Sequence, residues 1–236
     1  VKWGIGVDNV DFAACERLGL PIVNTPGMFG AEVADVALGY VIALARHLFE
    51  IDRGVREGRW PKPAGISLAG RRAAVAGLGD IGRNVAHRLM ALGMEVTAYD
   101  PGVSGDAGLP GLRRASWPDG LEEADVLVLT CALTPSSHHM VNADTLARAK
   151  PGIRVVNVAR GPLIDEAALA EALRSGQVHS AALDVFETEP LPMDSPLRQL
   201  PCLFGTHNGS NSVDAVHRAS GEAMERLAGF LAPAPA

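Results

Sequence analysis

The sequence predicts an α/β fold in which a doubly wound parallel sheet carries helices on both faces. Short apolar runs of strand length alternate with helical patterns between residues 73 and 205. One of these runs leads directly into a glycine fingerprint, Gly77 to Gly82, that joins a strand to a helix. The chain has 236 residues, of which 47% are hydrophobic and 20% charged, so it can bury a sizeable core.

The part of the chain before the fingerprint is predicted to contain two helices and an exposed arm. Residues 1–11 resemble the end of a strand followed by a glycine-bearing turn, and residues 12–20 form a short helix. A longer helix is predicted over residues 31–50, where apolar side chains recur at helical spacing. Because most of its circumference is apolar, it is either a core helix or an oligomer interface. Residues 51–66 are charged and proline-rich around Trp60, which predicts an exposed arm.

The stretch from Arg72 to Asp100 predicts a strand–loop–helix–strand unit. Residues 73–76 form the first strand, and an amphipathic helix follows the glycines as far as Gly93. Residues 95–99 form the second strand, which ends at Asp100. A G-x-G-x-x-G sequence also occurs at ordinary turns, but here every part of a dinucleotide-binding unit comes in the required order.

Each part of this unit has a predicted role in binding a dinucleotide. Gly77 makes the tight turn, Gly79 lets the pyrophosphate approach the backbone, and Gly82 lets the helix pack closely on the strand. Free N–H groups at the helix N-terminus face the phosphates. Asp100 is placed to accept hydrogen bonds from the adenosine ribose diol. Its charge would repel a 2′-phosphate, and residues 101–104 offer no Arg or Lys to hold one, so NAD is favoured over NADP.

Strands and helices continue to alternate beyond residue 100. Residues 104–120 are rich in Gly, Pro and charge and are predicted to form loops or short turns. Residues 124–130 form the next buried strand. The other predicted elements are helices over 142–149 and 165–175, strands over 153–158, 180–184 and 201–204, a terminal helix that begins at Ser212, and a disordered tail over 232–236. Asn142, Asp165 and Ser212 are the predicted N-caps.

Ligands of doubly wound sheets bind beyond the carboxyl ends of the strands. Residues from different strands should therefore line one crevice. The residues that this rule selects are Gly77 to Ile81, Asp100, Thr130, Cys131, Ala132, Ala159, Arg160, Gly161, Asp184, Thr206 and His207.

Three side chains near this crevice have chemistry that fits catalysis. Arg160 offers a fork of donors for a substrate carboxylate or carbonyl, although a surface Arg in a turn would look the same in the sequence. Glu189 and His207 could form an acid/base pair in which the carboxylate fixes the tautomer of the imidazole. The alternative is that both are unrelated surface groups. The other histidines are interpreted as solvated: His47, His87, His138, His139, His179 and His217.

Composition argues against several classes of function. A formal net charge of −6 and the lack of a Lys/Arg cluster disfavour nucleic acid or an anionic membrane as the main partner. The longest apolar runs are of about ten residues, too short to span a bilayer, and no signal peptide is recognised. The three cysteines are scattered without metal-ligand spacing, so we expect no metal site and a cytoplasmic location.

Five motifs come in the order seen in a known enzyme family. They are GIGVDNVD at 4–11, GLGDIG at 77–82, NVARGPLID at 157–165, DVFETEP at 184–190 and THNGS at 206–210. In these motifs the chain resembles the D-isomer-specific 2-hydroxyacid dehydrogenases, and most closely their phosphoglycerate dehydrogenase-like branch. The resemblance implies a Rossmann NAD-binding domain and hydride transfer between NAD and a D-2-hydroxy acid or 2-oxo acid.

The resemblance also implies roles for individual residues. Arg160 would grip the substrate, His207 would be the acid/base, and Glu189 would support His207. Backbone N–H groups near Ile5 and Gly6 would hold the substrate carboxylate. The residues implied to line the NAD site are Gly77, Gly79, Asp80, Ile81, Gly82, Asp100, Thr130, Cys131, Ala132, Val158, Ala159, Arg160, Asp184, His207 and Gly209.

Members of this family have a substantial segment before the first motif, and it builds most of a second, flavodoxin-like substrate domain. We therefore expect an N-terminally truncated chain. Residues 1–23 would be a remnant of the substrate domain, and residues 24–211 would be the NAD-binding domain. Residues 212–236 would be a helix returning to the substrate domain, followed by a tail. The resemblance further implies a homodimer formed through the cofactor domains.

Two alternatives to a 2-hydroxyacid dehydrogenase stay open. The first is a catalytically incomplete NAD-binding module or a corepressor-like protein, against which the joint presence of Arg160, Glu189 and His207 argues. The second is a formate or phosphonate dehydrogenase, which shares the scaffold but has no 2-hydroxyl to deprotonate. Turnover with formate or phosphite would support the second alternative.

Overall fold

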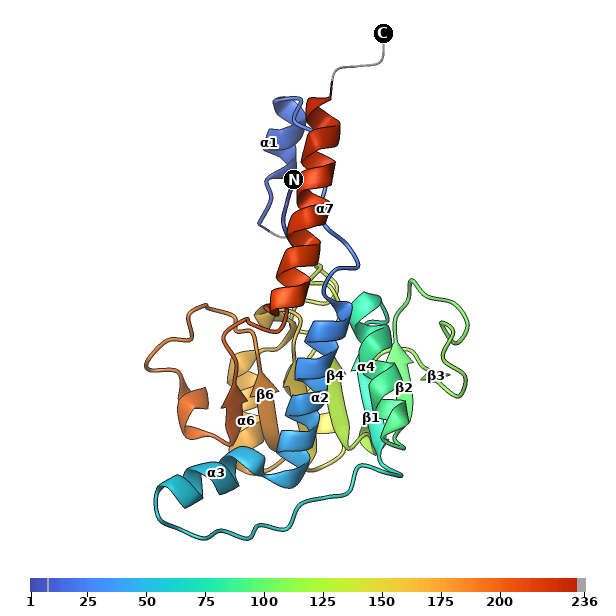
Figure 1. The fold of residues 1–236 in the computed structure, drawn as a ribbon. Helices are drawn as coiled ribbons and strands as arrows, with labels where there is room; N and C mark the ends of the chain where they lie inside the picture. The colour runs from blue at the N-terminus through green and yellow to red at the C-terminus, as the bar shows by residue number, and fades with distance from the viewer. Residues whose placement is uncertain (8, 233–236) are drawn as a thin grey trace.

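The structure, a computed structural model, describes residues 1–7 and 9–232. Asp8 in the first motif and residues 233–236 of the predicted disordered tail lie outside the described residues. Within the described part, the chain forms a seven-stranded parallel sheet with the strand order β3-β2-β1-β4-β5-β6-β7 (Figure 1). The strands are β1 (Arg72–Ala76), β2 (Glu95–Tyr99), β3 (Arg113–Arg114), β4 (Val126–Leu129), β5 (Ile153–Asn157), β6 (Val178–Leu183) and β7 (Cys202–Phe204). The predicted parallel α/β sheet is confirmed.

Helices cover both faces of this sheet. The helices α2 (Gly30–Arg46) and α4 (Asp80–Ala91) pack on one face, and α5 (Ala143–Arg148) and α6 (Glu166–Ser175) pack on the other (Figure 1). The other helices are α1 (Phe12–Arg17), α3 (Leu48–Arg56) and α7 (Val213–Leu231), with 3₁₀ turns at Leu121–Glu123, Gly161–Leu163 and Pro196–Gln199.

The two faces of the sheet bury two separate cores, and β4 shows why its sequence is continuously apolar. Leu127 lies in one core with Leu169 of α6, whereas Val128 lies in the other core with Val33 of α2. Both faces of a central parallel strand are covered by helices, so successive residues of such a strand are mostly apolar. This explains why strands were recognisable as short apolar runs rather than as alternating patterns.

The strand order reverses beside β1, and this reversal defines where a ligand can bind. The strands β2 and β3 lie on one side of β1, and β4 to β7 lie on the other. The connections that leave β1 and β4 therefore diverge at the carboxyl edge of the sheet. In doubly wound sheets this switch point is where the ligand crevice opens.

The predicted N-caps are confirmed. The side chains of Asn142, Asp165 and Ser212 each accept a hydrogen bond from the backbone N–H three residues later. Each cap satisfies one of the donors that a helix N-terminus leaves without an intrahelical partner. The starts of α5, α6 and α7 were predictable because this interaction depends only on residues close together in the sequence.

The single helix predicted over residues 31–50 is wrong. His47 adopts a left-handed conformation (φ 55°) that separates α2 from α3, and helical structure then continues to Arg56, inside the predicted arm. The His47 ring contacts His179, with ring centroids 5.4 Å apart, and its Nδ1 lies 3.0 Å from Glu50. Partial desolvation lowers the pKa of His179. The half-buried His47 is therefore packed against another ring rather than solvated, whereas His179 is exposed, as expected. The helical spacing of the apolar residues does not reveal the break at His47.

The loop predicted over residues 104–120 is partly wrong, because it contains the edge strand β3. This strand has two residues, Arg113 and Arg114, which pair with Thr97 and Ala98 of β2. Both are exposed and charged, so the segment lacks the apolar signal by which strands are recognised.

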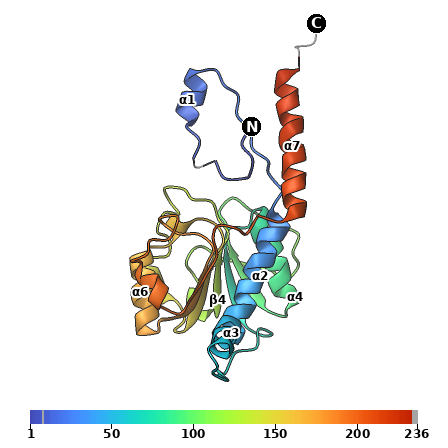
Figure 2. The ribbon, with the colours of Figure 1, turned by 60° about the vertical axis from the view of Figure 1, so that its left-hand side comes forward.

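The N-terminal segment and α7 both extend from the carboxyl edge of the sheet, as Figure 2 shows. The Trp3 ring contacts that of Phe29 at a centroid distance of 5.1 Å, and Arg218 of α7 forms an ion pair with Glu32 of α2. Along α7 the buried residues are Ala215 and Ala219. The division into three parts at residues 23 and 211 stays a prediction. Within the described ranges, none of the helices combines the length and the hydrophobicity needed to span a bilayer.

Candidate active site

The glycine loop after β1 is packed tightly at Gly77 and Gly82 but has open space at Gly79. A side chain at Gly77 (φ 95°) would lie 2.6 Å from the backbone of Cys131, and a side chain at Gly82 would overlap the Gly77 carbonyl group. Around Gly79, by contrast, the space that a Cβ would occupy has no neighbour within 4 Å among the described atoms. This is the arrangement that lets a pyrophosphate approach the backbone.

The start of α4 also fits an anion. Gly79 is its N-cap residue, and no side chain in the described part of the protein caps this helix end. The first-turn N–H groups and the helix dipole are therefore available to a phosphate. The Asp80 carboxylate lies to the side, against Gly30 at the start of α2, and Asn84 donates a hydrogen bond to the Asp80 carbonyl. Ile81 is half-buried against the core shared with α2.

Asp100, directly after β2, is fixed by the backbone at the carboxyl edge of the sheet. One carboxylate oxygen accepts a hydrogen bond from Leu78 N at 2.7 Å, and the other accepts one from Gly102 N at 2.8 Å. The Asp100 carbonyl accepts a hydrogen bond from the Arg114 guanidinium at 2.6 Å. The sequence showed no basic residue in 101–104, and the structure brings one from β3.

The turn after β4 forms the opposite wall of the glycine loop. The Thr130 hydroxyl lies 3.0 Å from the Ala76 carbonyl and 2.9 Å from the Gly77 carbonyl. Cys131 packs against Gly77 and places its sulfur 3.6 Å from that of Met140. Thr130 and Cys131 therefore shape the glycine loop, and the Ala132 carbonyl accepts a hydrogen bond from Ser137.

Two of the cysteines should be poorly reactive in the folded protein. Burial raises the pKa of Cys131 to about 11 and that of Cys202 to about 12, so few thiolates form near pH 8. We expect iodoacetamide at pH 8 to alkylate both at least about tenfold more slowly in native than in urea-unfolded protein. Mass spectrometry of tryptic peptides would measure the rates. Equal rates in the two states would contradict the burial of these thiols.

The Arg160 backbone is held by Asn157, the first residue of the NVARGPLID motif, which the sequence did not assign to the site. The buried Asn157, at the end of β5, donates to the Arg160 carbonyl at 2.8 Å and accepts from Ala159 N at 3.0 Å. The Arg160 guanidinium donates to the Ala159 carbonyl at 2.7 Å. Val158 N donates to the Leu129 carbonyl of β4 at 3.3 Å. A polar residue closing an apolar strand was the signal that could have identified Asn157.

The turn that carries Arg160 and the loop that carries Glu189 are in close backbone contact at Gly161. A side chain at Gly161 would overlap the carbonyl group of Phe186 and crowd the Glu187 amide. The two loops come from β5 and β6 and are separated in the sequence, so only the fold brings them into contact. Gly161 is therefore required by the close approach of two backbones.

Asp184 organises the loop that carries His207. Its buried carboxylate accepts hydrogen bonds from Gly209 N at 2.9 Å and Asn208 N at 3.2 Å, and its carbonyl accepts one from His207 N at 2.6 Å. The Tyr40 hydroxyl of α2 lies 3.5 Å from the same carboxylate. Burial and the Asp184 charge raise the pKa of Tyr40 to about 12. From the sequence, Tyr40 is only one of the residues of the helix predicted over residues 31–50.

Glu189 and His207 form the predicted pair. His207 Nδ1 lies 2.8 Å from one Glu189 oxygen, and Phe186 N donates to the other at 3.1 Å. An ionised carboxylate only accepts hydrogen bonds, so a neutral His207 bonded to Glu189 carries its proton on Nδ1 and keeps the lone pair of Nε2. His207 adopts φ 57°, a conformation rare for a non-glycine residue and frequent at functional sites.

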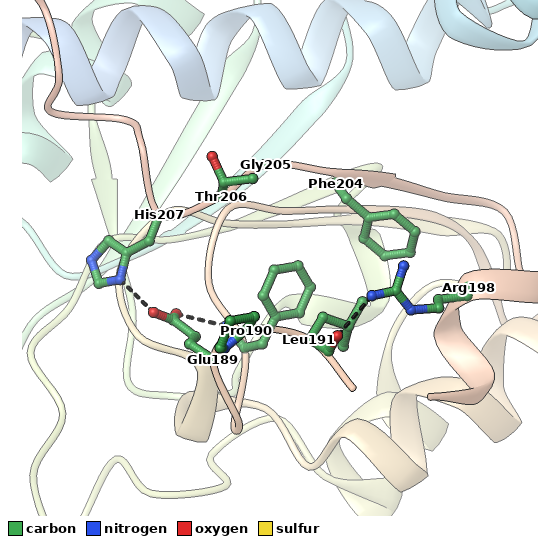
Figure 3. Close-up of a pocket in the computed structure, with 9 residues that line it drawn as sticks. Glu189, Pro190, Leu191, Arg198, Phe204, Gly205, Thr206 and His207 are labelled. Carbon is green, nitrogen blue, oxygen red and sulfur yellow. Dashed lines mark hydrogen bonds and ion pairs between the residues drawn. The ribbon is translucent and has the colours of Figure 1, made fainter. Parts of the chain in front are cut away.

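The pair lies at one end of a cavity of about 570 Å³, shown in Figure 3. Phe204 and Arg198 lie toward the other end. Arg198 donates hydrogen bonds to the carbonyls of Leu191 and Pro192, so it braces the loop after β6. The residues that line the cavity are Phe186, Glu189, Pro190, Leu191, Arg198, Phe204, Gly205, Thr206 and His207.

A second histidine–carboxylate pair corrects the interpretation of His139 as solvated. His139 Nε2 lies 2.5 Å from Glu187, and its ring stacks on that of His138 at 4.0 Å. Glu187 N donates to Glu166 at the start of α6 at 2.8 Å. Burial and the neighbouring Glu187 charge raise the pKa of Glu166. These contacts connect the Glu189 loop to two other elements.

The segment that contains Ile5 and Gly6 is hydrogen-bonded to Asn24 and Thr25, a few residues before α2. Asn24 donates to the Ile5 carbonyl at 2.8 Å, and Gly4 N donates to the Thr25 hydroxyl at 2.9 Å. Ile5 also packs against the core that contains α2. The contact of Ile5 and Gly6 with a substrate carboxylate stays a prediction.

A family model, related sequences and solved structures all match this chain to 2-hydroxyacid dehydrogenases and reductases. The family model "D-isomer specific 2-hydroxyacid dehydrogenase, NAD binding domain" matches residues 38–209. A hydroxypyruvate reductase of Thermotoga maritima is 38% identical over 230 residues, covering 95% of this chain and 74% of that protein. A D-3-phosphoglycerate dehydrogenase of Mycobacterium tuberculosis is 39% identical over 238 residues, covering 98% of this chain and 45% of that protein. The chain thus spans less than half of the mycobacterial relative.

Solved structures show the same fold. A glyoxylate reductase of Paecilomyes thermophila superposes with a TM-score of 0.89 at 32% identity, covering 95% of this chain and 69% of that one. A D-lactate dehydrogenase of Aquifex aeolicus, complexed with NAD and lactic acid, gives a TM-score of 0.87 at 26% identity, covering 96% of this chain and 74% of that one.

Proposed function

The chain belongs to the D-isomer-specific 2-hydroxyacid dehydrogenase family and carries its NAD-binding domain. From this premise we propose that it transfers a hydride between NAD and the C2 atom of a small D-2-hydroxy acid or 2-oxo acid. The observation that carries the proposal is the His207–Glu189 pair, 2.8 Å apart, at the same sheet edge as the glycine loop. A histidine oriented by a carboxylate is suited to moving the proton of a hydroxyl group.

In this proposal His207 Nε2 takes the proton of the C2 hydroxyl during oxidation and returns a proton to the developing alkoxide during reduction. Glu189 keeps the imidazole in the required tautomer and orientation through the bond to Nδ1. The half-exposed His207 ring is accessible to a substrate at the sheet edge. Bound NAD supplies the hydride acceptor, so the protein contributes alignment and electrostatics.

Arg160 orients the substrate in the same proposal. Its guanidinium can hold the carboxylate and the C2 oxygen of a 2-oxo acid in a bidentate geometry. Backbone N–H groups near Ile5 and Gly6 add contacts to the substrate carboxylate. Because Gly161 packs on the Phe186–Glu187 backbone, Arg160 and Glu189 are placed by one contact between their loops.

The cofactor would lie across the carboxyl edge from Asp100 to Asp184. Asp100 would accept the hydrogen bonds of the adenosine ribose, and the open backbone at Gly79 and the start of α4 would receive the pyrophosphate. Thr130 to Ala132 and Val158 to Arg160 would border the nicotinamide half, with Asp184 at its end.

We also propose a cytoplasmic homodimer joined through α2 and α3. Support comes from the apolar character of α2 and from large exposed apolar side chains on α3 and the arm after it, namely Leu48, Phe49, Val55 and Trp60. Exposed apolar side chains that recur within one short segment favour a protein contact there. Sedimentation velocity would test the dimer, and a monomer at every concentration would contradict it.

The first test is the binding of NADH, followed by fluorescence, to the wild-type chain and to Asp100→Ala. We expect the variant to bind about tenfold more weakly or worse, since it loses hydrogen bonds to a charged group. Asp194→Ala is the matched control, because Asp194 is exposed in the connection between β6 and β7, whereas Asp100 follows β2 near the other end of the strand order. Folded wild-type protein that fails to bind NADH would contradict the proposal.

A substrate panel then separates the remaining alternatives. The named relatives suggest hydroxypyruvate, glyoxylate, pyruvate and 3-phosphoglycerate as the first compounds, with NADH absorbance as the readout. Formate and phosphite belong in the same panel. Tight NADH binding without turnover of any compound would favour the catalytically incomplete module.

A further inference from the structure

The adenosine end of the crevice contains a guanidinium group that the proposed NAD site does not use. Arg114 lies on β3, which pairs with β2 just before Asp100, with Ala98 opposite Arg114 (Figure 1). Its guanidinium donates a hydrogen bond to the Asp100 carbonyl at 2.6 Å. The contact is with the carbonyl rather than the carboxylate, and among the described residues no carboxylate forms an ion pair with Arg114.

Two opposite charges therefore meet where the adenosine ribose would lie. The Asp100 carboxylate favours a ribose diol and repels a 2′-phosphate. The Arg114 guanidinium has the opposite preference, because its planar fork of donors matches phosphate oxygens. The neighbouring Arg113 differs, since its guanidinium lies 3.3 Å from Glu95 at the start of β2.

We propose that Arg114 is a cofactor-specificity residue that, together with the backbone after β2, forms a latent site for the 2′-phosphate of NADP. Asp100 keeps this site closed in the wild-type chain. Without its carboxylate, the Gly102 N–H that now donates to Asp100 becomes available to a phosphate oxygen beside the Arg114 guanidinium. This inference rests on the proposed function, because it concerns the cofactor of the same site.

The test is a set of fluorescence titrations with NADH and NADPH. The variants are Asp100→Ala, Arg114→Gln, the double variant, Arg114→Lys, and Arg113→Gln as the matched control on the same strand. We expect Asp100→Ala to tighten NADPH binding by about tenfold or more and the double variant to lose this gain, because a charge-assisted contact to phosphate is removed. Arg114→Lys should retain part of the gain, and Arg113→Gln should change NADPH binding by less than about twofold.

Several outcomes would overturn the inference. One is an unchanged NADPH affinity on adding Arg114→Gln to Asp100→Ala. Another is a loss of NADPH affinity in Arg113→Gln equal to that in Arg114→Gln, which would indicate only a general effect of positive charge on this strand. A third is an equal loss of NADH and NADPH affinity in Arg114→Gln, which would indicate that Arg114 merely supports the Asp100 backbone. In each of these outcomes the wild-type protein still binds NADH, so the proposed function stands. Failure of the folded wild-type protein to bind NADH would overturn the proposed function as well.

Discussion

The His207→Gln variant is expected to reduce 2-oxo acids with a kcat about 10²- to 10⁴-fold below that of the wild-type chain, while its Kd for NADH changes by less than about twofold. Glutamine can still donate or accept a hydrogen bond but cannot move a proton at Nε2. The loss should therefore appear in kcat rather than in cofactor binding. Steady-state rates with the best substrate of the panel and NADH fluorescence would measure the two quantities.

The matched control for this prediction is His217→Gln, because His217 is an exposed histidine on α7. It should leave kcat unchanged. Glu189→Gln adds a second comparison, since the amide preserves the size of the side chain but removes the carboxylate that orients His207 through Nδ1. A His207→Gln variant with wild-type kcat would show that the proton moves through another group.

The second large effect is expected at Gly161, which has no side chain that could take part in binding or catalysis. Gly161→Ala should destabilise the protein by about 1–3 kcal/mol, because its methyl group would overlap the Phe186 carbonyl and backbone atoms cannot move aside cheaply. If the loops separate instead, the overlap is relieved but the distance between Arg160 and Glu189 increases, and kcat should fall. We therefore expect Gly161→Ala to lower the free energy of unfolding, kcat or both.

Urea unfolding and steady-state kinetics would measure this effect. Gly221→Ala is the matched control, because Gly221 is in α7 and has open space where a Cβ would lie. Alanine should be neutral there or stabilising by about 0.5–1 kcal/mol. Equal stability of Gly161→Ala and wild type, with full activity, would show that the two loops are not in the close contact described above.

The features that were predictable from the sequence are those that depend on neighbouring residues. A strand buried on both faces is mostly apolar, an N-cap bonds to an amide three residues away, and a glycine loop of fixed spacing follows its strand. The parallel sheet, the caps at Asn142, Asp165 and Ser212, and the edge on which the site lies were therefore accessible without coordinates. Glu189 and His207 were accessible only as candidates, until the fold placed them 2.8 Å apart.

Other features became visible only in three dimensions, because they join residues distant in the sequence. Arg114 reaches Asp100 through an edge strand of two exposed arginines, which carries no apolar signal. Tyr40 reaches Asp184 across 144 positions, and Gly161 meets Phe186 between two loops. Local patterns report how a segment buries its own surface, whereas these contacts depend on which segments the sheet order makes neighbours.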